Sequence, residues 1–415
     1  MLSIGRQTLF YSIVLLLPTQ FGRHFWPAFS YVLGIRVDYL SPTLYVTDLI
    51  IFALFVLWIF SARKSNLKNQ ISKIALGYWK LVVFLAIGIL FSKSLASGLY
   101  GLVKFLEFLF FGLYTASHFK DLRKETVLIL FSVGIIFESL LAIFQFSNHG
   151  SLQGIFYFFG ERMFTSQTPG IANASLGGAL VLRPYGTFPH PNVLAGYLLV
   201  AMALVIFNIK QQTVKIWKVF CLISVAFGTI AIFLTLSRVA IVLWLAILGY
   251  TLLRSRGKFF IFHLSFIIFV LGLATPLGLR FSDIKLSDET LVQRGVLTKD
   301  SLTMIKDHPI FGVGLYNFLI SLPLYAKLQP VHNIFLLVLS ETGIIGFGFF
   351  IWFILKTYKR ILSKKSLASH FSLLILSSVL VLGMFDHYFL TLQQGQLLFC
   401  FILGLCWAPR EVWQK

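Results

Sequence analysis

The chain has 415 residues, of which 58% are hydrophobic and only 12% charged, and its mean hydropathy is +0.86. An ordinary soluble domain carries about 45–50% apolar and roughly 25% charged residues, so this composition excludes a water-soluble globule and a disordered chain. It also excludes an outer-membrane barrel, because barrel strands alternate in polarity and contain no long apolar runs. The sequence therefore predicts an all-α, polytopic membrane protein.

The charge balance is basic, with 35 Lys and Arg against 15 Asp and Glu and a net charge of +20. In a soluble protein this excess would suggest nucleic acid, but the cytoplasmic loops of membrane proteins collect Lys and Arg. We therefore expect no nucleic-acid partner. Cys221, Cys400 and Cys406 all lie in apolar runs, so neither a disulfide framework nor a zinc motif is indicated.

The first apolar run, Thr8 to Leu17, follows Arg6 and has the form of a signal-peptide core. The bulky stretch Phe21 to Trp26 offers no small-residue cleavage site, so an uncleaved first span is expected. A membrane span needs about 20 mostly apolar residues. About twelve segments are predicted to span: 7–22, 44–61, 74–92, 98–117, 125–147, 191–209, 219–235, 238–253, 259–277, 332–355, 367–385 and 394–408. The chain is expected to form one integral membrane domain, 1–415.

Lys and Arg are several times denser in one set of alternate loops than in the other. The basic set comprises 1–7, 62–73, 118–124, 210–218, 254–258, 356–366 and 408–415. The positive-inside rule places that set, and both termini, in the cytoplasm. Two long loops, 148–190 and 278–331, are then expected on the outer side, facing a periplasm or the cell exterior.

The loop 278–331 between the ninth and tenth spans contains a predicted helix. From Asp288 to Ile305, apolar residues recur at roughly helical spacing, at Leu291, Val292, Val296, Leu302 and Ile305. This pattern is typical of an amphipathic helix on a membrane surface. Pro309 and the turn Gly312–Gly314 are expected to end it.

Charged residues inside spans are costly and by default suggest function. Lys104 and Glu107 are three residues apart, so they are predicted to pair on one helix face. Asp48 lies near a span end and is expected to reach water. Glu138 and Glu341 lie deeper and are expected to be buried and hydrogen-bonded.

A second set of polar residues lies on the predicted outer side, near one membrane depth. It comprises Arg183 in the run Arg183–Asn192, Arg238 in Leu236–Val239, Arg294 on the expected surface helix, His332 with Asn333, and Asp386 with His387. Arginines suit phosphate oxygens, a histidine near neutrality can act as a base, and a carboxylate can orient it. These residues could therefore converge on a pocket for an anionic headgroup such as a lipid diphosphate.

Simpler interpretations remain open for each residue at this point. Each arginine could bind ordinary anionic lipid, and His332 or Asn333 could only cap a helix. Asp386 could pair with His387 or with a backbone amide. The histidines His190 and His308 are expected to pack within loops. No metal site is expected from the histidines, since no pair has the i, i+4 spacing of a helical zinc motif.

The string His332-Asn333, nine further residues and Gly343-Ile-Ile-Gly346 resembles the signature of the O-antigen ligase and polymerase superfamily. The runs Arg183–Asn192, Leu236–Ala240, Pro309–Gly314 and Phe385–Tyr388, and their order, are also similar to that family. The resemblance covers about residues 170–410. It implies a helical enzyme of the bacterial envelope that moves a glycan from undecaprenyl diphosphate to an acceptor hydroxyl in surface polysaccharide or lipopolysaccharide synthesis, by an inverting, metal-independent reaction without a cofactor.

Carried over by motif, His332 would be catalytic, Asp386 would support it, and Arg238 and Arg294, with Arg183, would bind the diphosphate. Gly343 and Gly346 are expected on one helix face, where they let a neighbouring helix pack closely, while Asn333 lies beside the site. Partners would be the lipid-linked donor, an acceptor hydroxyl on glycan, lipid or protein, and membrane lipid. Ligases, polymerases and protein O-glycosylating enzymes share these motifs.

A transporter or flippase of a lipid-linked glycan is the main alternative. Twelve spans and intramembrane charges would suit it, but a flippase needs charged positions through both leaflets. The unexplained polar groups of this sequence gather on one predicted face, which favours an enzyme. An internal repeat, common in transporters, is not evident.

Overall fold

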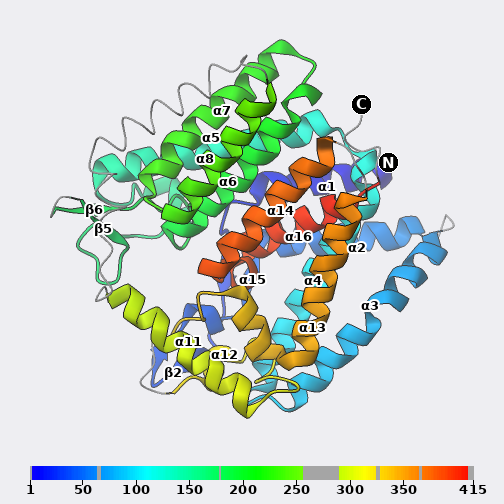
Figure 1. Cartoon of the computed structure of the whole chain (residues 1–415), viewed down its shortest axis with the longest axis vertical. Helices are drawn as coiled ribbons and strands as arrows, with labels where there is room; N and C mark the ends of the chain where they lie inside the picture. Colours follow the sequence, from blue (N-terminus) through cyan, green and yellow to red (C-terminus); the bar gives the residue numbers. More distant parts are fainter. Residues whose placement is uncertain are drawn as a thin grey trace.

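The computed structural model describes residues 2–62, 67–176, 179–255, 289–323, 328–363 and 367–409. These residues are mostly helical (Figure 1), as expected for an all-α membrane protein. The helices are α1 (Leu2–Leu16), α2 (Val46–Ala62), α3 (Leu67–Leu90), α4 (Leu95–His118), α5 (Lys124–Asn148), α6 (Pro191–Asn208), α7 (Lys215–Leu234), α8 (Arg238–Ser255), α11 (Glu289–Asp307), α12 (Phe318–Ser321), α13 (Ile334–Leu362), α14 (Leu367–Phe385), α15 (Tyr388–Thr391) and α16 (Gln393–Trp407).

Short antiparallel strand pairs complete the described elements. They are β1 (Gly22–His24) with β4 (Thr43–Tyr45), β2 (Tyr31–Val32) with β3 (Ile35–Arg36), and β5 (Asn173–Leu176) with β6 (Ala179–Leu182). In Figure 1, β2, β5, β6, α11 and α12 lie at one end of the molecule, and both chain termini lie toward the other. We call the end that carries these strand pairs the hairpin end. It corresponds to the predicted outer side.

Among the described residues, five helical segments are long and apolar enough to cross a membrane. They are Leu95–Asp121, Lys124–Asn148, Pro191–Gln211, Lys215–Leu234 and Ile334–Leu362. Shorter apolar helices are Val46–Ser61, Trp79–Leu90, Arg238–Thr251, Ser369–Phe385 and Gln393–Trp407. The predicted span 259–277 lies outside the described residues, and each other predicted span overlaps a described helix. The count of twelve spans stays a prediction.

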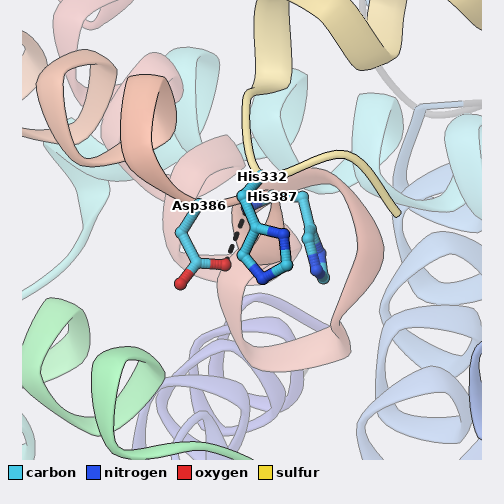
Figure 2. A group of neighbouring side chains, drawn as sticks. All are labelled: His332, Asp386 and His387. Carbon is cyan, nitrogen blue, oxygen red and sulfur yellow. Dashed lines mark hydrogen bonds between the residues drawn. The ribbon is translucent and has the colours of Figure 1, made fainter. Parts of the chain in front are cut away.

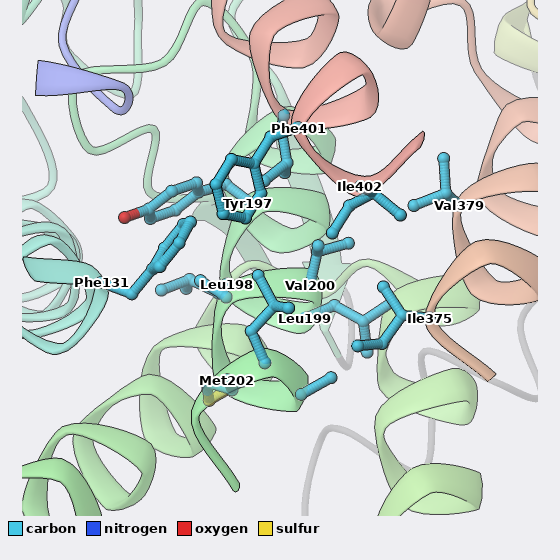
Figure 3. Packing of buried hydrophobic residues seen from close by; sticks show 14 of the residues in the cluster. Phe131, Tyr197, Leu198, Leu199, Val200, Met202, Ile375, Val379, Phe401 and Ile402 are labelled. Atoms are coloured by element: carbon cyan, nitrogen blue, oxygen red, sulfur yellow. The ribbon is translucent and has the colours of Figure 1, made fainter. Parts of the chain in front are cut away.

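Helix α6 is the centre of the bundle. Its side chains are apolar all round and nearly all buried, which is the pattern of a helix surrounded by other helices. Figure 3 shows its residues between Phe131 of α5, Ile375 and Val379 of α14, and Phe401 of α16. Helix α6 therefore packs against α5, α14 and α16, and its own beginning and the turn after α14 carry residues of the site described below.

A charged cluster links α2, α4 and α16 inside the bundle. Lys104 Nζ lies 2.9 Å from Glu107 Oε2, which confirms the predicted pair, and 2.9 Å from Asp48 Oδ1. The expectation that Asp48 reaches water is therefore wrong: its carboxylate also accepts a hydrogen bond from the Gln393 side-chain amide. Buried charges are retained where partners compensate for their lost hydration, and here the partners come from three helices.

Glu138 and Glu341 are hydrogen-bonded, as predicted. Glu138 accepts bonds from the backbone N–H of Thr187 at 3.0 Å and from its hydroxyl at 2.7 Å. These bonds hold the chain that leads into α6. Glu341 accepts a longer bond, 3.3 Å, from the backbone N–H of Phe318.

Helix α13 is broken at Gly343, whose φ of 61° and ψ of −171° are not helical. The loop Pro309–Gly314 fills the break: the Ile344 N–H donates to the Pro309 carbonyl at 2.8 Å, and a Cβ on Gly343 would collide with the Ile310 carbonyl. The expectation that both signature glycines admit a neighbouring helix is thus wrong for Gly343, whose neighbour is a loop. Gly346 does face another helix, since its nearest neighbours include Phe84 of α3.

The surface helix expected in the loop 278–331 is present as α11. It packs on α13 through Leu297, Ser301 and Met304, and the Ser301 hydroxyl lies 2.7 Å from that of Ser340. The apolar positions that predicted the helix point the other way. The exposed ones are Leu291, Val292, Val296 and Leu302. Helix α11 therefore presents an apolar face outward while a second face carries the packing.

Candidate active site

His332 is held at the entrance of α13 by its neighbour Asn333. The Asn333 side-chain oxygen accepts bonds from the backbone N–H groups of Phe335 at 2.9 Å and Leu336 at 3.0 Å, which is an N-cap. The Asn333 amide also donates to the Met384 carbonyl at 3.2 Å. Asn333 thus joins the beginning of α13 to the end of α14 and places His332 beside the turn after α14.

That turn carries Asp386 and His387. One oxygen of the Asp386 carboxylate accepts the His387 backbone N–H at 2.8 Å, and the other accepts the Asn192 side-chain amide at 3.1 Å. Figure 2 shows both imidazole rings, those of His332 and His387, on the same side of the Asp386 side chain. The two imidazole centroids are 5.1 Å apart and meet edge to face. Two chain segments far apart in sequence therefore supply one compact cluster.

Arg183 connects the cluster to other parts of the chain through hydrogen bonds. Its guanidinium donates from Nε to the Thr235 carbonyl at 2.7 Å and from one terminal nitrogen to the Asn192 side-chain oxygen at 2.6 Å. Asn192 passes the connection on to Asp386. Arg183, at 8% exposure, thus ties the α7–α8 turn and the beginning of α6 to the carboxylate.

The remaining predicted arginines are Arg294 and Arg238. Arg294 of α11 is close enough for its positive charge to act on the rings of His190 and His387. Arg238 is the first residue of α8 and half-buried, and it directly follows the turn that Arg183 holds. That turn includes Leu236, which has a positive φ of 53°. Arg183 and Arg294 therefore bring positive charge to the cluster, from the chain before α6 and from α11.

Burial controls the protonation of the cluster. It lowers the pKa of His387 to about 3, against the opposing attraction of Asp386. Burial and then the charge of Arg183 lower the pKa of His190 to about 3. Burial alone would raise the pKa of Asp386, but His387, His332, His190 and the Asn192 amide more than offset it, so this pKa lies below its ordinary value. At neutral pH the His190 and His387 rings are therefore neutral, and the Asp386 carboxylate is ionised.

Such a cluster has two chemical uses. A neutral imidazole beside a carboxylate can accept a proton and be stabilised when charged. The same donors can also hold a cation, because one ligand atom from each of His332, Asp386 and His387 lies within 4.8 Å of the others. Sequence spacing predicted no metal site, since these residues come together only through the tertiary fold.

Sequence reasoning missed several residues of this region. His190 was expected to pack in a loop, yet its ring accepts the Asn192 N–H at 3.1 Å as the N-cap of α6, and it lies close enough to Asp386 and His332 for electrostatic interaction. Asn192 and His387 were visible only as parts of longer motifs. Tyr39, from the chain between β3 and β4, meets the His387 ring edge-on at 5.4 Å, and nothing in its sequence neighbourhood points to this contact.

Comparison with known proteins gives one family. Residues 223–351 match the family model described as O-antigen ligase, and no curated protein matches the chain. The matched stretch contains Arg238, Arg294, His332 and the two signature glycines. The match supports an O-antigen ligase-like or polymerase-like glycan transferase in a membrane. The resemblance of this sequence to the O-antigen ligase superfamily is therefore confirmed, on a stretch shorter than a third of the chain.

Proposed function

We propose that the protein transfers a glycan from undecaprenyl diphosphate to an acceptor hydroxyl on the outer face of the bacterial cytoplasmic membrane. The observation that carries this proposal is the convergence of His332 with the ionised Asp386, while Arg294 lies close enough to act on the same cluster. These are a base, a carboxylate and a cation, the groups that glycan transfer from a lipid diphosphate requires. The family match gives the class of reaction.

In the proposed reaction His332 is the general base. The acceptor hydroxyl oxygen attacks the anomeric carbon of the donor, and its proton passes to His332. The bond from that carbon to the diphosphate oxygen breaks at the same time, with its electron pair going to undecaprenyl diphosphate. Attack opposite the leaving group inverts the anomeric centre. Asp386 stabilises the imidazolium that forms.

Arg238 and Arg294 bind the diphosphate in this proposal. A diphosphate leaves readily once its developing charge is held, so two guanidinium groups can do what a metal ion does elsewhere. Arg183 adds positive charge, and its bonds to Asn192 and Thr235 keep the carboxylate and the α7–α8 turn in place. The proposed reaction therefore needs no metal.

Sidedness follows from the positive-inside rule, which puts both termini in the cytoplasm and the hairpin end outside. The proposed donor would place its diphosphate at the membrane boundary, where the cluster lies between the helical bundle and the loops. Helix α11 would cover the site and limit the water that could hydrolyse the donor. Its exposed apolar face suits contact with lipid.

The test is a transfer assay with purified protein in lipid. The assay supplies an undecaprenyl-diphosphate-linked oligosaccharide, resolves products by mass, and includes His332→Ala beside His308→Ala, a change at an exposed histidine at the end of α11. Longer lipid-linked glycans would identify a polymerase. Transfer only upon addition of a separate acceptor would identify a ligase.

An intact donor in every condition would contradict the transferase proposal and favour a transporter of lipid-linked glycan. Full activity of His332→Ala would contradict the assignment of the base. Where His332→Ala loses activity, the His308→Ala control separates a specific effect from general damage.

A further inference from the structure

The three side chains in Figure 2 can together act as ligands of a metal ion, although the proposed transfer reaction needs no metal. We propose that His332, Asp386 and His387 bind a transition-metal ion of the Zn²⁺ or Co²⁺ type, and that the bound ion reversibly blocks glycan transfer. The inhibition rests on the proposed function, whereas the binding is a property of the three side chains. One ligand atom from each lies within 4.8 Å of the others.

The spacing needs only a small adjustment. Zinc binds imidazole nitrogen and carboxylate oxygen at about 2.0–2.2 Å, so two tetrahedral ligands lie roughly 3.4 Å apart. The donors therefore have to approach by an ångström or slightly more, which side-chain rotation supplies. His332 is only half-buried, so an ion has a route to the cluster.

His387 is already oriented as a metal-binding histidine is. Its Nδ1 lies 2.7 Å from the Thr391 hydroxyl oxygen, and that hydroxyl lies 3.2 Å from the His387 carbonyl. When the hydroxyl donates to this carbonyl, its oxygen accepts from Nδ1–H, and the ring then keeps its lone pair on Nε2. Metal-binding histidines commonly donate their other ring N–H to a protein acceptor in this way.

Asp386 is held from both sides in a similar manner. The His387 backbone N–H and the Asn192 amide each donate to one carboxylate oxygen, and every oxygen keeps a second lone pair. Two imidazoles with one carboxylate prefer Zn²⁺, Co²⁺ or Ni²⁺ to Mg²⁺ and Ca²⁺, which favour oxygen ligands.

The positive charge near the cluster weakens the binding of a metal ion, so that the proposed inhibition of transfer is reversible. Arg294 acts on the His387 ring, and its positive charge opposes a cation while it favours the diphosphate. The ion would occupy the His332 lone pair that has to accept the acceptor proton. Metal binding and transfer therefore exclude each other.

The binding test uses the full chain in detergent, purified without a histidine tag and titrated with CoCl₂. Cobalt held by histidine and carboxylate in tetrahedral geometry absorbs visible light. The expected spectrum saturates at one equivalent, disappears in His332→Ala and His387→Ala, and persists in His24→Ala. His24 is a matched control, since its ring also bonds to hydroxyls, those of Ser41 and Thr43, away from the cluster.

Two further variants guard against misfolding. Asp386→Asn keeps an acceptor oxygen and should weaken the cobalt signal, and Thr391→Val should reduce affinity by about 10–100-fold through loss of the second hydrogen bond of His387. Thermal unfolding checks that each variant is folded. A signal unchanged in both histidine variants, or lost in His24→Ala, would overturn the site.

The inhibition test adds ZnCl₂ to the transfer assay. Transfer should fall, recover upon addition of a chelator, and stay unchanged with the same concentration of MgCl₂. Stimulation by zinc would overturn the inhibitory role. A wild-type protein that transfers nothing in any condition would instead contradict the proposed function, while the cobalt spectrum would still decide whether the ion binds.

Discussion

The contacts that a side chain already makes indicate which role it can have at the candidate site. Arg183 has hydrogen bonds to Thr235 and Asn192, so it acts on the site through its neighbours. Arg294 acts on the histidines through its charge. Both side chains carry a guanidinium group, but their surroundings differ. Arg183 therefore positions its neighbours, and Arg294 is the better candidate for direct contact with a diphosphate.

Replacement of Arg294 tests that contact. Arg294→Lys is expected to lose nearly as much transfer activity as Arg294→Ala, because lysine keeps the charge but cannot make a two-pronged contact with phosphate oxygens. The measurement is kcat/KM for the lipid-linked donor. Lys299 on the same helix, exposed to solvent, provides the control Lys299→Ala. Wild-type turnover by Arg294→Lys would remove the proposed role.

The low pKa of His190 predicts how stability depends on pH. An unfolded histidine titrates near 6.5, whereas burial and Arg183 hold the folded pKa at about 3. The stabilising effect of neutral His190 is complete above about pH 6.5 and is lost as the pH falls toward 3, by up to about 1.4 kcal/mol per pH unit. His190→Asn keeps a capping acceptor and should flatten the melting-temperature curve on the acid side.

The control for this experiment is His149→Asn, at an exposed histidine, which should leave the acid slope unchanged. Thermal unfolding between pH 4 and 7 measures both variants. An acid slope as steep in His190→Asn as in the wild type would contradict the assignment.

At the scale of elements, helix ends are what bring the site together. The beginnings of α6 and α13, the end of α14 and the turn before α8 all meet at the hairpin end, joined by Asn192, Asn333 and Arg183. Long apolar segments such as α5 and α6 were predictable because hydropathy alone specifies them. The meeting of helix ends was not, because Arg183, Asp386 and Thr235 are brought together by tertiary packing that no local pattern records.

The difference between local sequence pattern and tertiary packing also explains which predictions were wrong. Asp48 near a span end looked like a side chain that reaches water, because its partners Lys104 and Gln393 belong to other helices. Gly343 looked like a packing glycine because its φ is not visible in a sequence. His332 and Asp386 were predicted from their polarity on the outer side and from motif resemblance, whereas Tyr39 has no motif and was missed.

Gly343 offers a test at this scale. Gly343→Ala is expected to destabilise the protein by about 2 kcal/mol or more, since a positive φ costs an L-residue roughly 1–2 kcal/mol and the added Cβ collides with the Ile310 carbonyl. Gly348→Ala is the matched control: its Cβ meets nothing, and Gly to Ala inside a helix stabilises by about 0.5–1 kcal/mol. Thermal unfolding compares the two. Equal effects would show that the break in α13 is not required.

At the scale of the whole molecule, the site depends on regions outside the family match. Residues 223–351 contribute Arg238, Arg294 and His332, but Asp386 and Asn192 lie beyond them. The loop 148–190 is also joined to the segment between α1 and α2, because Arg162 pairs with Asp38 at 3.3 Å on the surface. The candidate site is therefore built from more of the chain than the matched stretch.

The buried charges Asp48, Lys104 and Glu107 test how the bundle is held together. Lys104→Met is expected to lower the unfolding free energy by about 3–5 kcal/mol, because it leaves two buried carboxylates uncompensated. The triple variant Asp48→Asn, Lys104→Met, Glu107→Gln should regain most of that stability. Lys80→Met, at an exposed lysine on α3, is the control. A single variant as stable as the wild type would show that the cluster contributes nothing.

The break at Gly343 gives the spacing in the signature a physical meaning. The nine residues between Asn333 and Gly343 form a short helix of about 13 Å, anchored by a cap at one end and by the loop Pro309–Gly314 at the other. The length of this helical segment sets both the distance and the angle between His332 and that loop. One inserted residue would rotate His332 about the helix axis by about 100° and lengthen the segment by about 1.5 Å. For the position of His332 relative to the loop, the number of residues in this stretch therefore matters more than their identity.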